Sequence, residues 1–331
     1  MEFNALVVEK DEETNVTSSE VKKINLSDLP EGDVLVNVEY SNVNYKDGLC
    51  IGPGAGLVKT YPHVPGIDFA GTVETSQNDN YQKGDQVILT GWRVGEVVWG
   101  GYSQKARVKS SQLVKMPKNM TTKEAMIMGT AGFSAMLAII RLEEMGLSQE
   151  NGEVLVTGAT GGVGSVATLV LSNLGYEVVT VSGKSSSSEY LKSLGSKRIL
   201  DRSELNELIK RPLESALWAG CIDTVGGNTL SRLIGQLKYG ASVAVVGNAG
   251  GNNLSASAIP FMLRGVNMLG IDSAMQTYEN RVKIWERLNK DFPKSFFESI
   301  TEVISLSDLP RVGKEILDGK IKGRLVVDVN L

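Results

Sequence analysis

Residues 153–164, EVLVTGATGGVG, set the expected architecture of the chain. Val154, Leu155 and Val156 form a short apolar run of the kind that builds a buried strand. The glycines that follow keep the spacing G-x-G-x-x-G, except that Ala159 stands at the first position. Gly161 lets the backbone approach a pyrophosphate, and Gly164 lets the next helix pack close to the strand. With the N–H groups of that helix facing the phosphates, the segment predicts a dinucleotide site. We expect the cofactor to contact Thr160, Gly161, Gly162 and Val163.

The chain after this turn alternates between helical and strand-like patterns. Apolar residues from Val163 to Leu174 recur at the spacing of one helix face, and Gly175 ends the pattern. A nucleotide-hydrolysing phosphate loop is excluded because Ser165 follows the last glycine where such a loop needs lysine. A glycine turn without a ligand is the alternative. The pattern predicts an α/β fold with a doubly wound parallel six-stranded sheet. Its strands are expected at residues 153–157, 177–181, 198–200, 221–225, 242–246 and 267–271.

The end of the second expected strand carries Ser182, Gly183 and Lys184. An Asp or Glu at this position binds the ribose hydroxyls of NAD. Here a lysine and a hydroxyl suit a 2′-phosphate, the glycine makes room for it, and Arg198 of the third strand is a further candidate. One or two charge-assisted hydrogen bonds of about 1.5–3 kcal/mol each would favour NADPH over NADH by about 10–1000-fold. The alternative is that Lys184 is a solvated surface lysine.

The serines that follow have a local explanation. Ser186 and Glu189 have the spacing of a capping box, in which the two residues bind each other's backbone N–H groups. Tyr190, Leu191 and Leu194 then supply a short apolar face, and Gly195 ends it. The run predicts the start of a helix.

The first third of the chain is expected to be β-rich. Residues 33–40 alternate between apolar and polar side chains, as in a half-buried strand. Further strands are expected at 3–9, 71–74, 86–89 and 103–108, and helices from 122 and at 133–142. The tail carries two expected helices, 278–288 and 309–317, and a last strand, 324–329, that we expect to return to the β-rich domain. The expected domains are therefore 1–123, 124–274 and 275–331.

Composition narrows the class of protein. The 331 residues are 42% hydrophobic and 22% charged, which is usual for a globular protein. A net charge of −4 disfavours nucleic-acid binding. We expect no membrane span, because no apolar run approaches about 20 residues, and no signal peptide. The two cysteines and the single histidine, His63, are too few for a disulfide framework, a multi-cysteine zinc site or most hydrolase triads. We expect a cytoplasmic protein.

Five motifs along the chain resemble the zinc-independent medium-chain dehydrogenase/reductase superfamily. They are NVNYKD (42–47), PGIDFAG (65–71), KGDQV (83–87), GTAGF (129–133) and the glycine turn (158–164). LTGW (89–92), WGG (99–101), DTVG (223–226), PFMLR (260–264) and IKGR (321–324) resemble its acryloyl-CoA reductase branch more closely. The resemblance implies a GroES-like β-rich catalytic domain, a Rossmann domain, NADPH and a cytoplasmic homodimer.

One departure from the superfamily bears on the substrate. Zinc alcohol dehydrogenases carry Gly-His-Glu where this chain has Gly66, Ile67 and Asp68. Isoleucine cannot ligate a metal, so we expect no metal site and no Lewis acid to polarise an alcohol or aldehyde. This shifts the expected substrate toward an activated alkene. We interpret Asp68 as structural, because a carboxylate would oppose the charge of an enolate.

The resemblance also implies roles for single residues. Tyr45 would lie near the nicotinamide, where its phenol acts as an acid or merely packs on the cofactor. Thr130 would contact the nicotinamide. Asn44, Trp92 and Arg93 are candidates for the substrate mouth, although a packed Trp92 and a solvated Arg93 explain them equally well. Further cofactor positions are Asn248, Met262, Ser273 and Arg324.

The implied reaction is reduction of the C=C bond of an α,β-unsaturated acyl-CoA, with acryloyl-CoA as the first candidate. Hydride would reach the β-carbon, charge would develop on the thioester oxygen, and the α-carbon would take a proton. An NADPH quinone or alkenal reductase on the same scaffold is the nearest alternative. A catalytically inactive NADPH-binding module is a more remote one.

Overall fold

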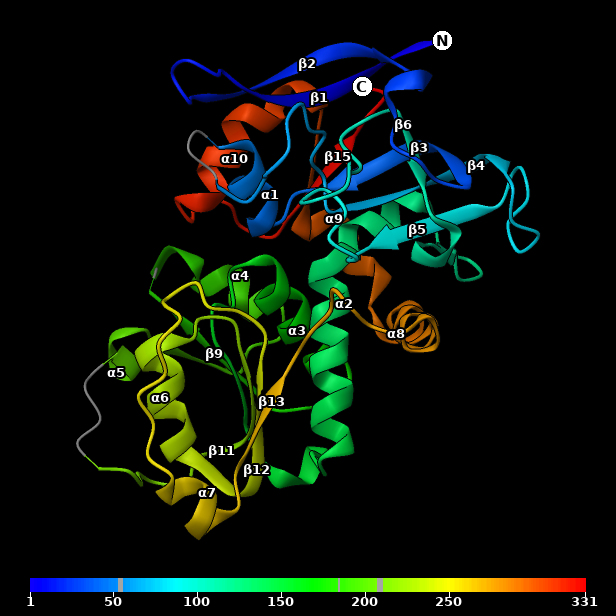
Figure 1. Cartoon of the computed structure of the whole chain (residues 1–331). Coiled ribbons are helices and arrows are strands. Elements are labelled where there is room, and N and C mark those ends of the chain that lie inside the picture. Colours follow the sequence, from blue (N-terminus) through cyan, green and yellow to red (C-terminus); the bar gives the residue numbers. More distant parts are fainter. Residues whose placement is uncertain (53–55, 184, 207–210) are drawn as a thin grey trace. The chain divides into compact units, whose positions relative to one another are not determined.

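A computed structural model describes residues 1–52, 56–183, 185–206 and 211–331 (Figure 1). These residues form two compact units. Unit 1 holds 1–130, 274–289 and 295–331, and unit 2 holds 131–273 and 290–294. The chain therefore changes unit after Thr130 and again after Ser273, and most of the tail belongs to unit 1.

Unit 2 is built on a six-stranded sheet in the order β10-β9-β8-β11-β12-β13, with every neighbouring pair parallel. The glycine turn follows β8, at the centre of the sheet, and each predicted strand is present. The doubly wound sheet predicted from the sequence is confirmed. The strands are β8 (Val154–Val156), β9 (Val178–Ser182), β10 (Arg198–Asp201), β11 (Trp218–Asp223), β12 (Leu237–Val245) and β13 (Asn267–Gly270).

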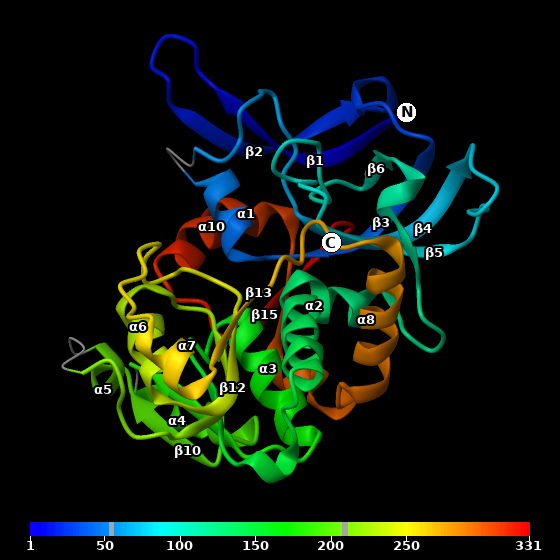
Figure 2. The same cartoon turned by 60° about the horizontal axis from the view of Figure 1, so that its bottom comes forward.

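Helices flank this sheet on both sides, with α6 on one side and the second half of α2 on the other (Figures 1 and 2). Apolar side chains of β8, β9, β11 and β12 pack with those of α6 in one buried cluster. The helices are α2 (Thr122–Glu144), α3 (Gly162–Asn173), α4 (Ser188–Ser193), α5 (Ser203–Asn206), α6 (Gly227–Gln236) and α7 (Ile259–Arg264).

Unit 1 is β-rich. Its main sheet has seven strands, ordered β14-β15-β3-β4-β5-β7 with β6 paired to β3, while β1 and β2 form a separate antiparallel pair. The strands are β1 (Glu2–Lys10), β2 (Thr17–Asn25), β3 (Val34–Asn42), β4 (Asp68–Ser76), β5 (Gln86–Thr90), β6 (Lys105–Val108), β7 (Val114–Lys115), β14 (Thr301–Ile304) and β15 (Arg324–Asp328).

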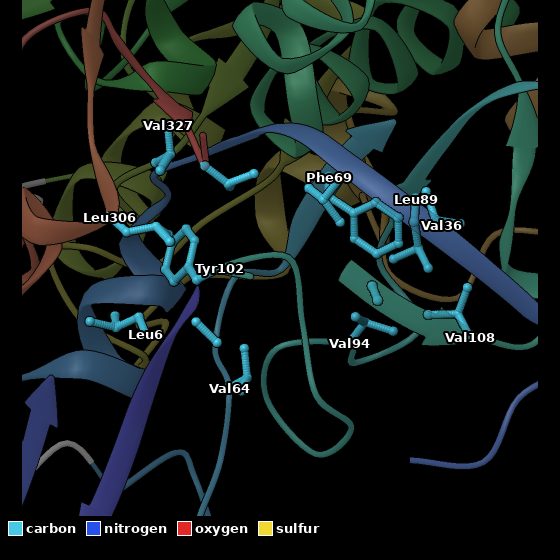
Figure 3. Close-up of a cluster of buried hydrophobic side chains, with 14 of the residues drawn as sticks. Leu6, Val36, Val64, Phe69, Leu89, Val94, Tyr102, Val108, Leu306 and Val327 are labelled. Atoms are coloured by element: carbon cyan, nitrogen blue, oxygen red, sulfur yellow. The ribbon is translucent and has the colours of Figure 1, made fainter. Parts of the chain in front are cut away.

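The core of unit 1 gathers side chains that are far apart in the sequence. Leu6, Phe69 and Tyr102 lie within one buried cluster with Leu306 and Val327 of the tail (Figure 3). This packing ties the last strands to the first third of the chain, as the sequence predicts. The helices of this unit are α1 (Tyr45–Ile51), α8 (Tyr278–Asp291, whose last two residues fall in unit 2), α9 (Phe297–Ile300) and α10 (Leu309–Leu317).

Helix α2 is interrupted. Gly129 has φ 50° and ψ −155°, so the helix consists of two segments, as the two predicted helices indicate. Among the described residues, α2 alone is long and apolar enough to cross a membrane, but 89% of its apolar window is buried in the structure. Burial of this kind is what the core helix of a folded domain shows.

Two local expectations differ from the structure. The helix begins later than the capping box at Ser186 predicts, because a 3₁₀ turn (Ser185–Ser187) comes first and α4 begins at Ser188. Its cap residue, Ser187, has φ −96° and ψ 0° and makes no side-chain capping bond. The strands β2, β7 and β14 are present without having been predicted.

Candidate functional site

The glycine turn has the geometry of a phosphate cradle. Gly158 has φ 58°, and α3 begins at Gly162 with Gly161 as its cap residue. A Cβ on Gly164 would lie 2.4 Å from the carbonyl oxygen of Gly158, so only glycine permits this packing. The first N–H groups of a helix have no acceptor within it, and the first turn of α3 carries no acidic side chain. Thr160, Gly162 and Val163 are partly exposed here. This donor set fits the pyrophosphate of a dinucleotide.

The carboxyl end of β9, the second predicted strand, carries the polar residue Ser182 and the small residue Gly183. Ser182 is the last residue of β9 and pairs in register with Asp201, the last residue of β10. Gly183 is exposed, and a Cβ on it would lie 3.1 Å from Nε of Arg202. The backbone N–H of Arg202 donates to the carbonyl of Ser182 at 3.1 Å. Lys184 lies outside the described residues. Among the residues that the structure describes, the cation next to Gly183 is Arg202.

Arg198 does not suit the role given to it. It is the first residue of β10, pairs in register with Val179, and forms an ion pair with Glu153 at 2.7 Å. Its guanidinium also lies 5.6 Å from the ring centroid of Trp218, the first residue of β11. These partners mark the amino edge of the parallel sheet, whereas ligands bind at the carboxyl edge.

Met262 is likewise misplaced for the cofactor within this unit. It is 77% exposed on α7, which leads into the amino end of β13. Two residues later, Arg264 donates to the carbonyls of Gly235, near the end of α6, and Leu237, the first residue of β12. Asn248 and Ser273, in contrast, follow the carboxyl ends of β12 and β13. Of these three predicted cofactor residues, only Asn248 and Ser273 lie at the carboxyl edge of the sheet, where the glycine turn also lies.

In unit 1, a buried carboxylate organises several of the predicted residues. Asp68 is fully buried at the start of β4. Its Oδ2 accepts the backbone N–H of Thr130 at 2.7 Å, and its Oδ1 accepts the Thr130 hydroxyl at 2.5 Å. The amide of Asn44 donates to Oδ2 at 3.0 Å and to Oδ1 of Asn42 at 2.7 Å. The interpretation of Asp68 as structural agrees with these contacts.

Gly129 makes this arrangement possible. A Cβ at this position would lie 1.9 Å from Nδ2 of Asn42 and 2.7 Å from Oδ2 of Asp68. The break in α2 also directs the N–H of Thr130 away from the helical ladder and toward the carboxylate. Glycine at position 129 therefore allows the backbone conformation in which Thr130 hydrogen-bonds to Asp68.

A second buried carboxylate lies nearby. Asp47 accepts the backbone N–H groups of Ile67 at 2.9 Å and of Asn44 at 2.8 Å. Burial, followed by the charge of Asp68, raises the pKa of Asp47 to about 7. These bonds fix the chain before α1, where Asn44 and Tyr45 stand.

Tyr45 and Arg324 contrast in exposure. Tyr45 is 49% exposed at the first position of α1, so its phenol is accessible. Arg324 is 2% exposed, and its Nε donates to the carbonyl of Ile127 at 2.8 Å, just before the break in α2. Arg324 is therefore not an ordinary surface charge.

The loop that carries Trp92 and Arg93 is held in an unusual backbone conformation. Both residues have positive φ, 56° and 58°, which is rare outside glycine. Arg281, almost fully buried, lies 4.6 Å from the ring centroid of Trp92 and donates to the carbonyls of Thr90 and Ala274 at 2.7 Å. Trp92 is half-buried and Arg93 exposed, so of the two Arg93 is the more accessible to a ligand.

Two kinds of residue escape sequence reasoning at this site. Arg202 could have been found from the register of β10, because it directly follows the residue that pairs with Ser182. Asn42 carries no such signal, since its amide donates to the carbonyl of Met126, 84 positions away in the chain. Among the described residues there is no group of three or more His, Cys, Asp or Glu side chains that could hold a metal.

Comparisons with known proteins agree with this geometry. Residues 30–118 match the family described as alcohol dehydrogenase GroES-like domain, and residues 162–287 match the zinc-binding dehydrogenase family. The chain is 61% identical to acrylyl-CoA reductase AcuI of Ruegeria pomeroyi over 99% of both chains. The NADPH-bound structure of Escherichia coli YhdH has a TM-score of 0.95 and 48% identity, covering 98% of this chain and all of the other. The NAD-bound structure of Bacillus subtilis YhfP has a TM-score of 0.95 and 42% identity, covering 99% and 100%.

Proposed function

Because the chain belongs to the medium-chain dehydrogenase/reductase superfamily, alongside the acrylyl-CoA reductases, we propose that it reduces the C=C bond of an α,β-unsaturated acyl-CoA with NADPH. The observation that carries the proposal is 61% identity to an acrylyl-CoA reductase over the full length of both chains. Acryloyl-CoA, with its three-carbon acyl group, is the preferred substrate.

NADPH is held mainly by unit 2 in this proposal. The glycine turn and the first turn of α3 bind the pyrophosphate. Ser182, Gly183 and Arg202 receive the 2′-phosphate, together with Lys184. Arg202 takes the place first given to Arg198, because it lies at the carboxyl edge beside Gly183. When bound, NADPH supplies the hydride for the β-carbon of the alkene.

The chain's own contribution is to orient the reactants and to stabilise charge on the thioester oxygen, which needs hydrogen-bond donors. Asn44 and Thr130 are unsuitable donors, because their N–H and O–H groups point to Asp68 and Asn42. The accessible phenol of Tyr45 can donate to the oxygen or supply the proton for the α-carbon. Arg93 remains a candidate for the mouth of the substrate site.

A quinone or alkenal reductase is the second candidate. Bacillus subtilis YhfP, 43% identical over 98% of both chains, carries quinone oxidoreductase in its name. A quinone and an enoyl thioester are both activated alkenes, so the same hydride donor serves either. Pocket contacts with the CoA group would distinguish them.

We also propose a cytoplasmic homodimer. Strand β13 is at the edge of the six-stranded sheet, and such an edge offers unpaired backbone groups to a second chain. Exposed apolar side chains accompany it, among them Met268 of β13 and Met262 and Leu263 of α7. Light scattering on the purified protein measures the mass of the assembly, and cell fractionation tests the location.

The function is tested by following NADPH oxidation with enoyl-CoA thioesters of increasing chain length, a 1,4-quinone and a free enone. The proposal expects the highest kcat/KM for the three-carbon thioester. A higher value for the quinone or the free enone would support the second candidate. No oxidation with any acceptor, in a protein that still binds NADPH, would leave only an inactive binding module.

A further inference from the structure

Unit 2 contains a cavity of about 190 Å³ at the amino edge of its sheet, opposite to the edge that carries the glycine turn. One wall is the end of α2 and the turn after it, with Leu142, Met145 and Leu147. The other wall is the start of β12, together with Ala219 of β11. A cavity of about 150 Å³ can hold a molecule the size of benzene. One small ligand would therefore meet the groups on both walls.

An irregularity in β12 makes room for this cavity. Trp218 of β11 pairs in register with Leu237 of β12. The next pair is Gly220 with Ser242, so two steps along β11 face five steps along β12. The extra residues leave the regular pairing of the two strands, which disrupts the ladder and re-aims the side chains. The walls of the cavity therefore include residues of the bulge as well as of the regular strands.

The first polar group on the wall is a buried hydroxyl. Val243 packs in the cluster shared with α6, and successive side chains of a strand point to opposite faces, so Ser242 points to the face covered by α2 (Figure 1). A Cβ on its register partner Gly220 would lie 3.2 Å from Cδ1 of Leu147, which agrees with this direction. Ser242 is 4% exposed, and its Oγ has no hydrogen-bond partner among the described residues. A buried hydroxyl without a partner is destabilising, and a ligand in the cavity can satisfy it.

The second polar group is the ammonium of the partly buried Lys238, in the bulge. Its Nζ donates to the backbone carbonyl of Asn151 at 2.7 Å. A Cβ on Gly152 would lie 2.6 Å from this Nζ, so the glycine leaves space for the ammonium. An ammonium has three N–H donors, of which the described residues take one. The others can bind an anion, and Lys238 carries the only charge among the described residues that line the cavity.

We propose that this cavity binds a short aliphatic monocarboxylate. Its two oxygens accept from Nζ of Lys238 and Oγ of Ser242, and its chain lies on Leu142 and Leu147. A monoanion balances the single positive charge of the lysine. The apolar wall favours an alkyl chain over a small, strongly hydrated anion such as phosphate. All of these residues belong to unit 2 and lie away from the glycine turn, so the proposal does not depend on the proposed function.

Ligand-observed NMR titration of the full chain with sodium pentanoate tests the proposal at equilibrium. Each buried CH₂ strengthens binding about fourfold, so the affinity should rise from acetate through butanoate to pentanoate. The neutral 1-pentanol should bind about tenfold more weakly than pentanoate, because it lacks the charge-assisted bond. Saturating NADP⁺ should leave the Kd for pentanoate unchanged, because the cofactor site lies at the other edge of the sheet. No saturable binding of pentanoate, binding no tighter than that of acetate, or displacement by NADP⁺ would overturn the proposal.

Variants locate the ligand. Lys238→Met keeps the length of the side chain but removes its charge, so it should weaken pentanoate about tenfold and leave 1-pentanol nearly unchanged. Ser242→Ala should weaken pentanoate about fivefold, the effect of one hydrogen bond. The matched control is Lys197→Met, which removes an exposed lysine that pairs with Glu177 outside the cavity, and it should have no effect. Equal pentanoate binding by the natural chain and Lys238→Met, or an equal loss in Lys197→Met, would overturn the proposal. Circular dichroism checks the fold of each variant, and if Ser242→Ala does not fold, the two lysine variants decide.

Discussion

Arg202 lies against Gly183 at the carboxyl edge of the parallel sheet, where a Cβ on the glycine would be 3.1 Å from Nε of the arginine. The two residues directly follow β9 and β10, which are consecutive in the chain and neighbours in the sheet. A planar guanidinium binds a phosphate with two parallel N–H groups. The position therefore combines a cation with the open space that a glycine leaves.

The first prediction is that Arg202→Ala weakens NADPH binding and leaves NADH binding unchanged. Loss of a charge-assisted bond of about 1.5–3 kcal/mol corresponds to a rise in Kd of about 10–100-fold. Titration of protein fluorescence with each cofactor measures both constants. Arg198→Ala is the matched control, because Arg198 binds Glu153 at the opposite edge. Equal weakening with NADPH and NADH would show that Arg202 does not recognise the 2′-phosphate.

Lys184→Ala extends this test to a residue outside the described part of the chain. If the lysine shares the 2′-phosphate, it should raise the KM for NADPH about tenfold and leave that for NADH little changed. An equal loss with both cofactors would assign Lys184 another role.

The third prediction concerns Gly129→Ala. Its positive φ would cost alanine about 1 kcal/mol, and its Cβ would collide with Asn42 and Asp68. Overpacking of this kind adds about 1–3 kcal/mol. Urea unfolding should show a clearly larger loss of free energy of unfolding than in Gly265→Ala, where φ is 58° and no atom lies within 4 Å of the added Cβ. Similar losses in the two variants would mean that the surroundings of Gly129 give way.

The sequence predicts the sheet of unit 2 well because its signals are local. The glycine turn, the apolar strand before it and the helix after it lie within about two dozen consecutive residues, and each supports the others. Strand β2, TSSEVKKIN, lacks such a signal because it has no continuous apolar face, and its conformation comes from pairing with β1. Its absence from the prediction reflects tertiary contact overriding local pattern.

The candidate site also divides into features with a local sequence signal and features that depend on tertiary contacts. The phosphate turn could be identified from sequence, since spacing alone specifies its geometry. The choice between Arg198 and Arg202 needed the register of β10 on β9. Arg198 begins β10 and Arg202 follows its end, so the two arginines lie at opposite edges of the sheet, and only the pairing shows which one lies beside Gly183. The contacts of Asp68 with Thr130 and Asn44 join residues more than 20 positions apart, and no local pattern announces them.

The fourth prediction is that Arg281→Ala strongly destabilises the fold. The variant would leave the buried carbonyl of Thr90 without this donor and remove the contact of the guanidinium with the Trp92 ring. The partly buried carbonyl of Ala274 would lose one donor but would keep the backbone N–H of Trp92. An unsatisfied buried group costs about 1–3 kcal/mol, so we expect a loss of about 2–3 kcal/mol in urea unfolding. Arg311→Ala, whose exposed partners are Glu315 and Asp308, should lose less than about 1 kcal/mol. A loss as small for Arg281 would show that water replaces the guanidinium.

The fifth prediction is a pH dependence of stability that originates at Asp47. Its folded pKa, about 7, lies above the ordinary value near 4, so in this window the folded state holds a proton that the unfolded chain releases. The free energy of unfolding should therefore fall as pH rises from about 4 to about 7 and stay lowered above that. Urea unfolding at several pH values measures the slope, to which one proton contributes at most about 1.4 kcal/mol per pH unit. The slope should be shallower in Asp47→Asn and unchanged in the exposed control Asp79→Asn. Equal slopes in all three proteins would place the proton elsewhere.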